Sequence, residues 1–272
     1  MGILCRVLNV RRSGFYAWRA RPESERARVD KQLAVEVRSA FLENRRSYGS
    51  PRIHVELRAK GRTVGRHRIA RLMRVQRLQA RKRRRFVTTT DSAHECPVAP
   101  NLVRRNFEAS VPNQVWAGDV TFIPTAEGWL YLAMLLDLFS RRVVGWAMSD
   151  KNDEALTVTA LQMAIDQRDP PAGLIHHTDR GTTYASTEYQ DLLRTRGLKC
   201  SMSRKGNCLD NAVAESFFST LKTECTAAMT FPSREAARRA VFDYVAGFYN
   251  PTRRHSTIGY LSPMEFEGAI RH

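Results

Sequence analysis

The sequence predicts an α/β core, with a mixed five-stranded sheet and flanking helices, preceded by an all-α region. Charge divides the chain: residues 1–110 hold 27 Lys and Arg against 9 Asp and Glu, whereas residues 111–272 hold 17 against 18. Periodicity divides it at nearly the same place, because apolar residues recur at helical spacing in the first part and strand-like segments begin near residue 113. Three strands followed by helix, strand, helix, strand and helix are typical of a mixed sheet with helices on both faces.

The surplus of cations indicates a polyanionic partner. Nucleic acid is the first candidate, because clustered Arg and Lys bind phosphates and release counterions; an anionic membrane surface and a solvated basic face are the alternatives. The longest apolar run, around Leu130 to Leu138, is too short to span a bilayer and contains Asp137. The N-terminus has no stretch typical of a signal peptide, and the five cysteines form no CxxC pair. We therefore expect a cytoplasmic protein with reduced thiols, located at the nucleoid when bound to DNA.

Residues 1–46 are predicted to form an N-terminal helical segment. Two short helices are expected over residues 1–20 and a longer helix over residues 24–44. The longer helix has apolar residues at helical spacing, namely Leu33, Val37, Ala40 and Phe41.

Residues 47–80 are predicted to form a helix-turn-helix module. Ser50 is expected to cap a first helix with Pro51 at its first position, Gly61 to end it, and a second helix to begin near Gly65. Two helices joined by a short Gly-containing turn favour DNA binding, with a plain basic bundle as the alternative. The predicted DNA contacts lie on the outward face of the second helix: Arg66, His67, Arg68 and Arg71.

Residues 81–112, which begin RKRRRF, show little periodicity and are predicted to be a basic linker. Residues 113–228 are the predicted α/β core, and residues 229–272 a helical extension of it. The core contains strand-like segments at VWAGDVTFI, WLYLAMLLDLFS, RRVVGWAMS, GLIHHTDRG and LKCSMS, and helix-like segments at DEALTVTALQMAIDQR, STEYQDLLRTRG and the stretch after Asp210. PTAEG is expected to connect the first two strands as a hairpin.

Three carboxylates are candidates for a shared site. Asp119 lies inside the first strand, Asp179 ends the fourth, and Glu215 stands on the last core helix, which Asp210 is predicted to cap. A helix docked through its apolar face would lay Glu215 along the sheet, near both aspartates. That face consists of Ala214, Phe217, Phe218 and Leu221.

Converging carboxylates with no Lys or Arg beside them repel one another, and a divalent cation removes that cost. Oxygen-only ligands suit Mg²⁺ or Mn²⁺, and two such ions could activate a water and stabilise the leaving oxygen of a phosphodiester. Each carboxylate taken alone has a plain alternative as a structural, turn-forming or solvated side chain.

Taken together, several stretches resemble a known family. Asp119, followed by Asp179 and Glu215 with 35 residues between them, resembles the DDE pattern of the retroviral-integrase superfamily, whose core is RNase H-like. More closely, the chain resembles the OrfB transposase of bacterial insertion sequences of the IS-three family. The stretches that carry this resemblance are SYGSPRIHVELRAKG, WAGDVTFI, HTDRGTTY, DNAVAESFFSTLKTE and YNPTRRHSTIGYLSPMEFE.

The resemblance implies a DNA transposase in which Asp119, Asp179 and Glu215 are catalytic and bind the metal ions. Water would free a 3′-OH at the element end, and that 3′-OH would attack a second phosphodiester. The implied partners are the terminal inverted repeats, target DNA, a second copy of the chain on DNA, and the product of an upstream frame as a fusion or separate chain. A non-catalytic DNA-binding regulator and an RNase H-like nuclease without joining activity are the alternatives.

Further DNA contacts are predicted on the core. Lys222 shares a helical face with Glu215 and matches a family lysine expected near DNA, with a plain surface lysine as the alternative. Arg204 and Lys205 precede a Gly-containing loop that would approach the DNA backbone.

Two further positions are each open to two interpretations. Arg253 and Arg254 either contact DNA or tie the last helix to the core. His177 lies on the same strand face as Asp179, so it either supports a metal ligand or is a buried strand histidine.

Overall fold

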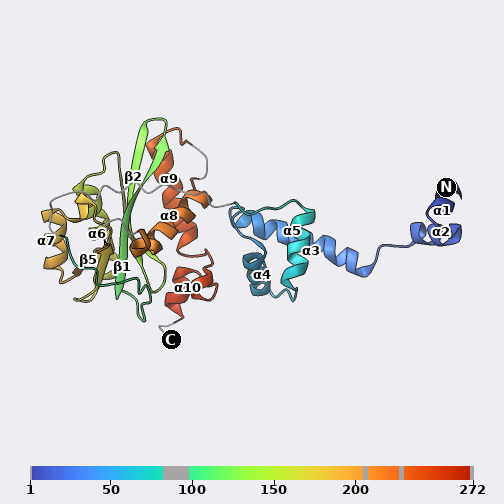
Figure 1. Ribbon diagram of the computed structural model, residues 1–272, viewed down its shortest axis with the longest axis horizontal. Coiled ribbons are helices and arrows are strands. Elements are labelled where there is room, and N and C mark those ends of the chain that lie inside the picture. Colours follow the sequence, from blue (N-terminus) through green and yellow to red (C-terminus); the bar gives the residue numbers. More distant parts are fainter. Residues whose placement is uncertain (1, 82–97, 205–207, 227–229, 270–272) are drawn as a thin grey trace. The chain divides into compact units, whose positions relative to one another are not determined.

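The computed structural model describes residues 2–81, 98–204, 208–226 and 230–269. The chain divides into two compact units, residues 1–80 and residues 81–272. The first unit is all helical and the second surrounds a sheet with helices (Figure 1), which confirms the predicted fold class. In the described parts of the chain, no helix is both long and apolar enough to cross a membrane.

The described part of the first unit contains five helices: α1 (Gly2–Val7), α2 (Arg12–Ala20), α3 (Glu25–Glu43), α4 (Ser50–Ala59) and α5 (Arg66–Val75). Helices α3, α4 and α5 contact one another. The apolar positions predicted from helical spacing form their core, because a packed bundle buries one stripe of each helix. This core contains Leu33, Val37, Ala40, Phe41, Ile53, Leu57, Ile69, Leu72 and Met73.

The predicted start of α4 is wrong by one residue. Gly49 is the N-cap and has an extended backbone, while Ser50 already has helical geometry and no side chain caps the helix. Pro51 remains in the first turn, where its missing N–H costs no helical hydrogen bond. The end is as predicted, since Gly61 follows α4 with φ +80°.

The second unit is built on a five-stranded mixed sheet with the order β3-β2-β1-β4-β5. Antiparallel pairing joins β1 to β2 and β2 to β3, and parallel pairing joins β1 to β4 and β4 to β5. The strands are β1 (Val115–Thr125), β2 (Gly128–Asp137), β3 (Val143–Ser149), β4 (Ile175–Thr178) and β5 (Lys199–Met202). This arrangement confirms the predicted five-stranded mixed sheet.

Two strand boundaries differ from the sequence prediction. The hairpin after β1 is tighter than PTAEG suggests, because β1 continues through Pro124 and pairs Thr125 with Gly128. Strand β2 ends at Asp137, whose carboxylate accepts the N–H groups of Asn113 (2.7 Å) and Phe139 (2.8 Å). Those bonds turn the chain away before the rest of the apolar run can join the strand.

Helices cover both faces of the sheet (Figure 1). Helices α6 (Glu154–Arg168) and α7 (Thr187–Thr195) pack on one side, and α8 (Ala212–Glu224) and α9 (Arg234–Tyr244) on the other. Gly145 permits the close approach of α6, since a Cβ at this position would lie 2.4 Å from the carbonyl oxygen of Ala160. The chain then passes through a π-helical turn (Val245–Tyr249) to α10 (Pro263–Gly268).

Residues 101–105, at the end of the predicted linker, pack against the second unit's core. Val103 is buried, and the N–H of Leu102 donates to Ser201 Oγ on β5 (2.9 Å). Asn101 Nδ2 donates to the Asp210 carboxylate (3.0 Å). The segment lacks periodicity because it packs as irregular chain along the core. Residues 82–97, which hold most of the basic run, lie outside the described residues.

Candidate active site

The three candidate carboxylates come from three elements on one side of the sheet. Asp119 lies mid-strand on β1 and faces α8, because its neighbour Val120 packs into the core on the α6 side. Asp179 follows β4 directly, and Glu215 lies in the first turn of α8. Backbone N–H groups fix the two aspartates: Val120 donates to Asp119 (2.8 Å) and Gly181 to Asp179 (2.9 Å).

Helix α8 docks as the sequence predicts. Ala214, Phe217, Phe218 and Leu221 are buried. The Phe217 ring meets the Tyr249 ring edge to face, with centroids 4.8 Å apart. Glu215 stays exposed at the border of this apolar face, where its carboxylate can reach toward the aspartates.

The carboxylates influence one another electrostatically. Burial raises the pKa of Asp119 well above its usual value, and the negative charges of Asp179 and Glu215 raise it further against the opposing effect of the Val120 N–H. Burial and the charge of Asp179 also raise the pKa of Glu215. The structure therefore places the three groups within electrostatic reach of one another.

The donor set fits a divalent cation in its chemistry. All the ligating atoms would be oxygens, which suit Mg²⁺ or Mn²⁺, and a cation would relieve the repulsion that raises these pKa values. Within the described residues, no group of three His, Cys, Asp or Glu side chains is arranged to hold a metal ion as it stands.

A lysine accompanies the carboxylates, on the helix face where the sequence placed Lys222 beside Glu215. Lys222 is half-buried on α8, and its Nζ lies 5.0 Å from the centre of the Phe122 ring. Burial lowers its pKa, and the charge of Asp119 opposes that shift. Lys222 thus supplies positive charge at the Asp119 side of the site.

Asp210 does not cap α8, so that prediction is wrong. Asn211 is the N-cap, and no side chain accepts a capping hydrogen bond. The buried Asp210 carboxylate instead accepts bonds from Arg204 Nε (2.9 Å), Arg204 Nη2 (3.0 Å), Arg105 Nε (3.0 Å) and Asn101 Nδ2 (3.0 Å). The hydrogen bond from Arg204 is the main reason that its pKa lies well below the usual range.

His177 is a buried strand histidine that also connects the site's elements. Its Nε2 lies 2.9 Å from the carbonyl oxygen of Asp210, and its Nδ1 lies 2.8 Å from Ser201 Oγ. Because a carbonyl only accepts, Nε2 carries the proton and Nδ1 accepts from the serine. Burial lowers the pKa of His177, which favours this neutral form. The ring thus joins the strand that precedes Asp179 to the turn that precedes α8.

Of the two interpretations of Arg253, the structure supports the one in which it ties the C-terminal segment to the core. Its side chain is only 3% exposed, and Nη2 and Nε each lie 2.7 Å from an oxygen of Glu224 on α8. The Tyr244 hydroxyl donates to the same carboxylate (2.8 Å). Glu224 was not among the residues singled out from the sequence. The one indirect indication of it was its partner Arg253 in YNPTRR. The second interpretation fits, because Arg253 ties the C-terminal segment to the core.

The basic residues predicted on α5 fall into two groups. Arg66 and His67 are exposed. Arg68 and Arg71 form ion pairs with Asp30 of α3, with Arg68 Nε at 2.7 Å from the carboxylate. These pairs hold the second group toward α3.

The predicted cations of the core are also mostly engaged. Arg204 is bound to Asp210 but remains about half exposed. Arg254 is half-buried and donates from Nη1 to the carbonyl oxygen of Tyr260 (3.1 Å). Lys205 lies outside the described residues.

Comparison with protein families finds three matches along the chain. An HTH-like domain matches residues 28–86, and integrase core domains match residues 109–208 and 196–263. Among individual proteins, the chain is 46% identical to transposase InsF for insertion sequence IS3A of Escherichia coli K12, covering 97% of this chain and 92% of that protein. It is 44% identical to the 31 kDa protein of insertion element IS600 of Shigella sonnei, covering 97% of each.

Among solved structures, the chain is similar to a simian T-cell lymphotropic virus intasome, solved in complex with a PP2A regulatory subunit. The sequence identity is 19% and the TM-score 0.50, over 65% of this chain and 60% of that chain. The catalytic core domain of HTLV-2 integrase in complex with magnesium matches at 20% identity and a TM-score of 0.42. The match covers 59% of this chain and 99% of that chain. At such identities the likeness concerns the fold alone.

Proposed function

The chain belongs to the IS3-family transposases of the InsF type, and on this premise we propose that Asp119, Asp179 and Glu215 are its catalytic carboxylates. The supporting observation is their arrangement: three elements far apart in sequence bring them to the α8-covered face, where burial and the charge of Asp179 raise the pKa of both Asp119 and Glu215. Repelling carboxylates at such a site favour a cation-binding role over a structural one.

The three side chains would hold Mg²⁺ or Mn²⁺, as two ions. When bound, such ions supply Lewis-acid stabilisation of phosphoryl oxygens and lower the pKa of a water. Backbone bonds from Val120 and Gly181 preset the orientation of the aspartates, and docking of α8 fixes the path of Glu215.

The reaction is direct transfer at phosphorus in two steps. Water attacks the phosphodiester at the element end, the bond from phosphorus to the 3′ oxygen breaks, and that oxygen leaves as a 3′-OH. The 3′-OH then attacks a phosphodiester of the target and displaces the target's own 3′ oxygen. The number of phosphodiester bonds is unchanged in the second step, so joining needs no external energy source. Positioning and charge stabilisation supply most of the catalysis.

DNA would meet the protein through both units. Lys222 lies beside the carboxylates and is suited to a phosphate of the bound end, and the exposed Arg66 and His67 offer cations in the helical unit. Holding two element ends requires at least two copies of the chain on DNA. The product of the upstream frame is a further proposed partner, fused or separate.

A cleavage-and-joining assay on labelled DNA carrying the element's ends tests this proposal. In Mg²⁺ or Mn²⁺, wild type should nick the 3′ end and join it to target, and Asp119→Asn, Asp179→Asn and Glu215→Gln should each lose both steps by at least about 100-fold. Glu188→Gln is the matched control, since Glu188 is also an exposed glutamate in the first turn of a helix.

The outcomes separate the candidate roles. Retained joining in all three carboxylate variants would refute the assignment, and cutting without joining in excess target would favour a nuclease. An inactive wild type is tested again with the upstream product supplied, as a fusion. If the fused protein binds the element end but neither cleaves nor joins it, the result would contradict the catalytic proposal and favour a regulator.

A further inference from the structure

Ion pairs divide the cations of the helical unit into two sets. The acids of α3 neutralise one set: Asp30 pairs with Arg68 and Arg71, Glu36 with Arg62, and Glu43 with Lys60. Among the described residues, His54 and Arg58 of α4 form no hydrogen bond or ion pair. The side of α4 that bears His54 and Arg58 is therefore one surface of this unit whose basic side chains no acid of the described residues neutralises.

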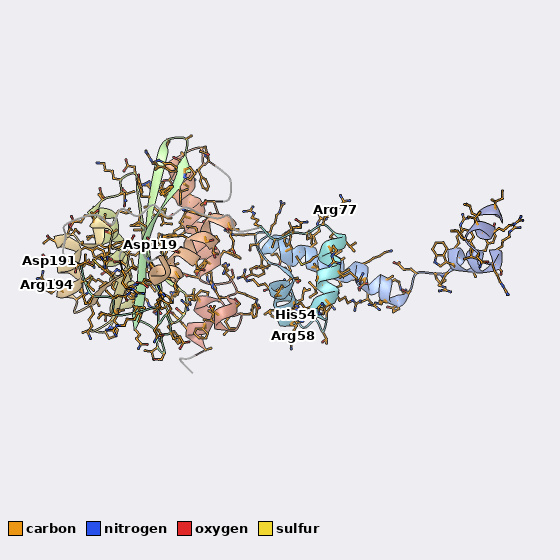
Figure 2. The ribbon with its side chains drawn as sticks, in the orientation of Figure 1. His54, Arg58, Arg77, Asp119, Asp191 and Arg194 are labelled. Carbon is orange, nitrogen blue, oxygen red and sulfur yellow. The ribbon has the colours of Figure 1, made fainter. Side chains whose placement is uncertain are left out.

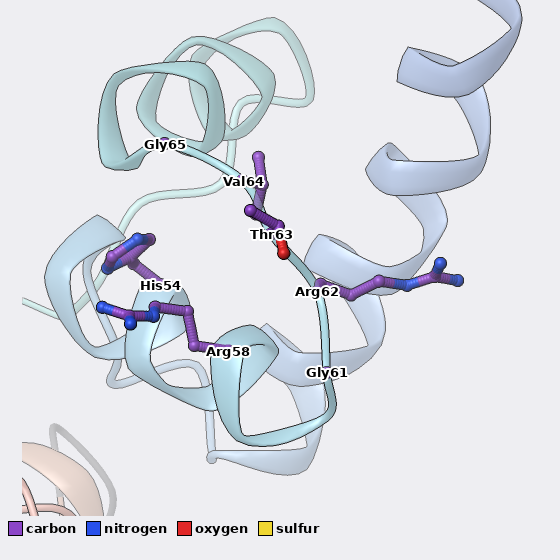
Figure 3. Close-up of a pocket in the computed structure, with 7 residues that line it drawn as sticks. All are labelled: His54, Arg58, Gly61, Arg62, Thr63, Val64 and Gly65. Atoms are coloured by element: carbon purple, nitrogen blue, oxygen red, sulfur yellow. The ribbon is translucent and has the colours of Figure 1, made fainter.

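These two side chains line a cavity at the turn between α4 and α5. The cavity has a volume of about 530 Å³ and is bounded by His54, Arg58 and the turn residues Gly61 to Gly65. His54 and Arg58 stand one helical turn apart and extend to the same side, whereas Arg62 extends away from them toward its partner Glu36 (Figure 3). Glu56, the acidic residue of α4, does not line the cavity.

The backbone adds to this charge. Helix α5 begins at the cavity wall with Gly65 as N-cap, and no side chain caps it. The N–H groups of its first turn therefore keep a partial positive charge that favours an anion. An unpaired arginine and histidine, a cavity and an uncapped helix start together form a site for a compact anion such as a phosphate.

We propose that this cavity binds a backbone phosphate of DNA through His54 and Arg58, and so positions the start of α5 on the duplex. The inference rests on the proposed function, because it identifies how the helical unit holds the DNA on which the carboxylates act. It moves the main phosphate contact from Arg68 and Arg71, which Asp30 already holds, to α4 and the turn. A phosphate contact positions the protein without reading sequence.

Salt-dependent DNA binding by the full-length chain tests the proposal. Fluorescence anisotropy would follow binding to two labelled duplexes, one with the element end and one unrelated, across a series of NaCl concentrations in EDTA. Arg58→Gln should weaken binding to both duplexes by a similar factor, about 3- to 10-fold, and lower the slope of log affinity against log salt by about one. His54→Gln should weaken binding in the same sequence-independent way, and Arg58→Glu should weaken it by more than Arg58→Gln.

Arg77→Gln is the matched control. Arg77 is an exposed arginine just past the opposite end of α5, well apart from His54 and Arg58 (Figure 2). It should change affinity by less than about 2-fold and leave the salt slope in place. Far-UV circular dichroism checks that the variants remain folded, which is expected because Arg58 is exposed.

Three results would overturn the proposal. The first is an unchanged salt slope for Arg58→Gln. The second is a loss of DNA affinity in Arg77→Gln equal to that in Arg58→Gln. The third is a loss of affinity confined to the element-end duplex, which would indicate base contact. The carboxylate assignment is tested separately, because binding in EDTA involves no cleavage and can be measured on the Glu215→Gln chain.

Discussion

The buried ion pair between Glu224 and Arg253 predicts a large and local effect on stability. Arg253→Met removes both 2.7 Å bonds to the Glu224 carboxylate, which still accepts the hydrogen bond from the Tyr244 hydroxyl. Because both side chains are at most 5% exposed, water cannot replace the lost bonds without opening the structure. An uncompensated buried charge of this kind costs about 3–5 kcal/mol of unfolding free energy.

A double-mutant cycle isolates the pair. Glu224→Gln with Arg253→Met removes both charges, so the double variant should be less destabilised than the sum of the single variants by about 2 kcal/mol or more. Hydrogen exchange read by mass spectrometry suits a chain of two units, because peptides from residues 81–272 report the opening of that unit alone. Exchange should rise most in α8, which also carries Glu215.

A cost below about 1 kcal/mol for Arg253→Met, the value of an exposed pair, or additivity of the two single variants would contradict a strong buried pair. Arg239→Met is the control, because Arg239 forms an exposed pair with Glu235 one helical turn away and should change the same exchange by less than about 0.5 kcal/mol.

Three further predictions follow from the same structure. In EDTA at neutral pH, Asp119→Asn should stabilise the protein, because burial and repulsion raise the folded-state pKa of Asp119 and its ionised carboxylate therefore disfavours the fold. The gain seen in urea denaturation should shrink as the pH falls through the folded-state pKa toward the unfolded value, and no gain at neutral pH would contradict the repulsion. Gly145→Ala should cost about 1–3 kcal/mol in the same assay, because its Cβ would meet the Ala160 carbonyl, and a neutral effect would mean that α6 can shift freely. Asp210→Asn should slow end cleavage by about 10-fold or more while DNA affinity changes little, because it loosens the turn that positions Glu215; equal losses in both assays would indicate a general defect.

The secondary structure could be predicted from the sequence because its signals are local. Helical spacing identified the buried stripe of α3, α4 and α5, and the strand order predicted the mixed sheet. The errors fell at boundaries, where a single interaction decides the outcome. The carboxylate of Asp137 ends β2 inside a long apolar run, and Gly49 takes the cap position that Ser50 was expected to hold.

The charged residues were harder to interpret, because their partners are remote in sequence. Asp210 has the sequence position of a helix cap, just before α8, yet it binds Arg105, more than one hundred residues earlier. Arg253 lies in a run that resembles a DNA-binding surface, yet Glu224 holds it in the interior. No local pattern distinguishes a paired arginine from one that is available to phosphate.

Local sequence patterns were therefore enough to predict the elements, their order and the three carboxylates whose spacing resembles that of a known family. The packing of distant segments was needed to show that Lys222 lies beside Asp119, that His177 joins β4 to the turn before α8, and that residues 101–105 pack against the core. The two kinds of feature depend on interactions of different range. Backbone conformation and burial stripes follow from neighbouring residues, whereas pKa shifts and ion pairs depend on which distant side chains share a low-dielectric environment.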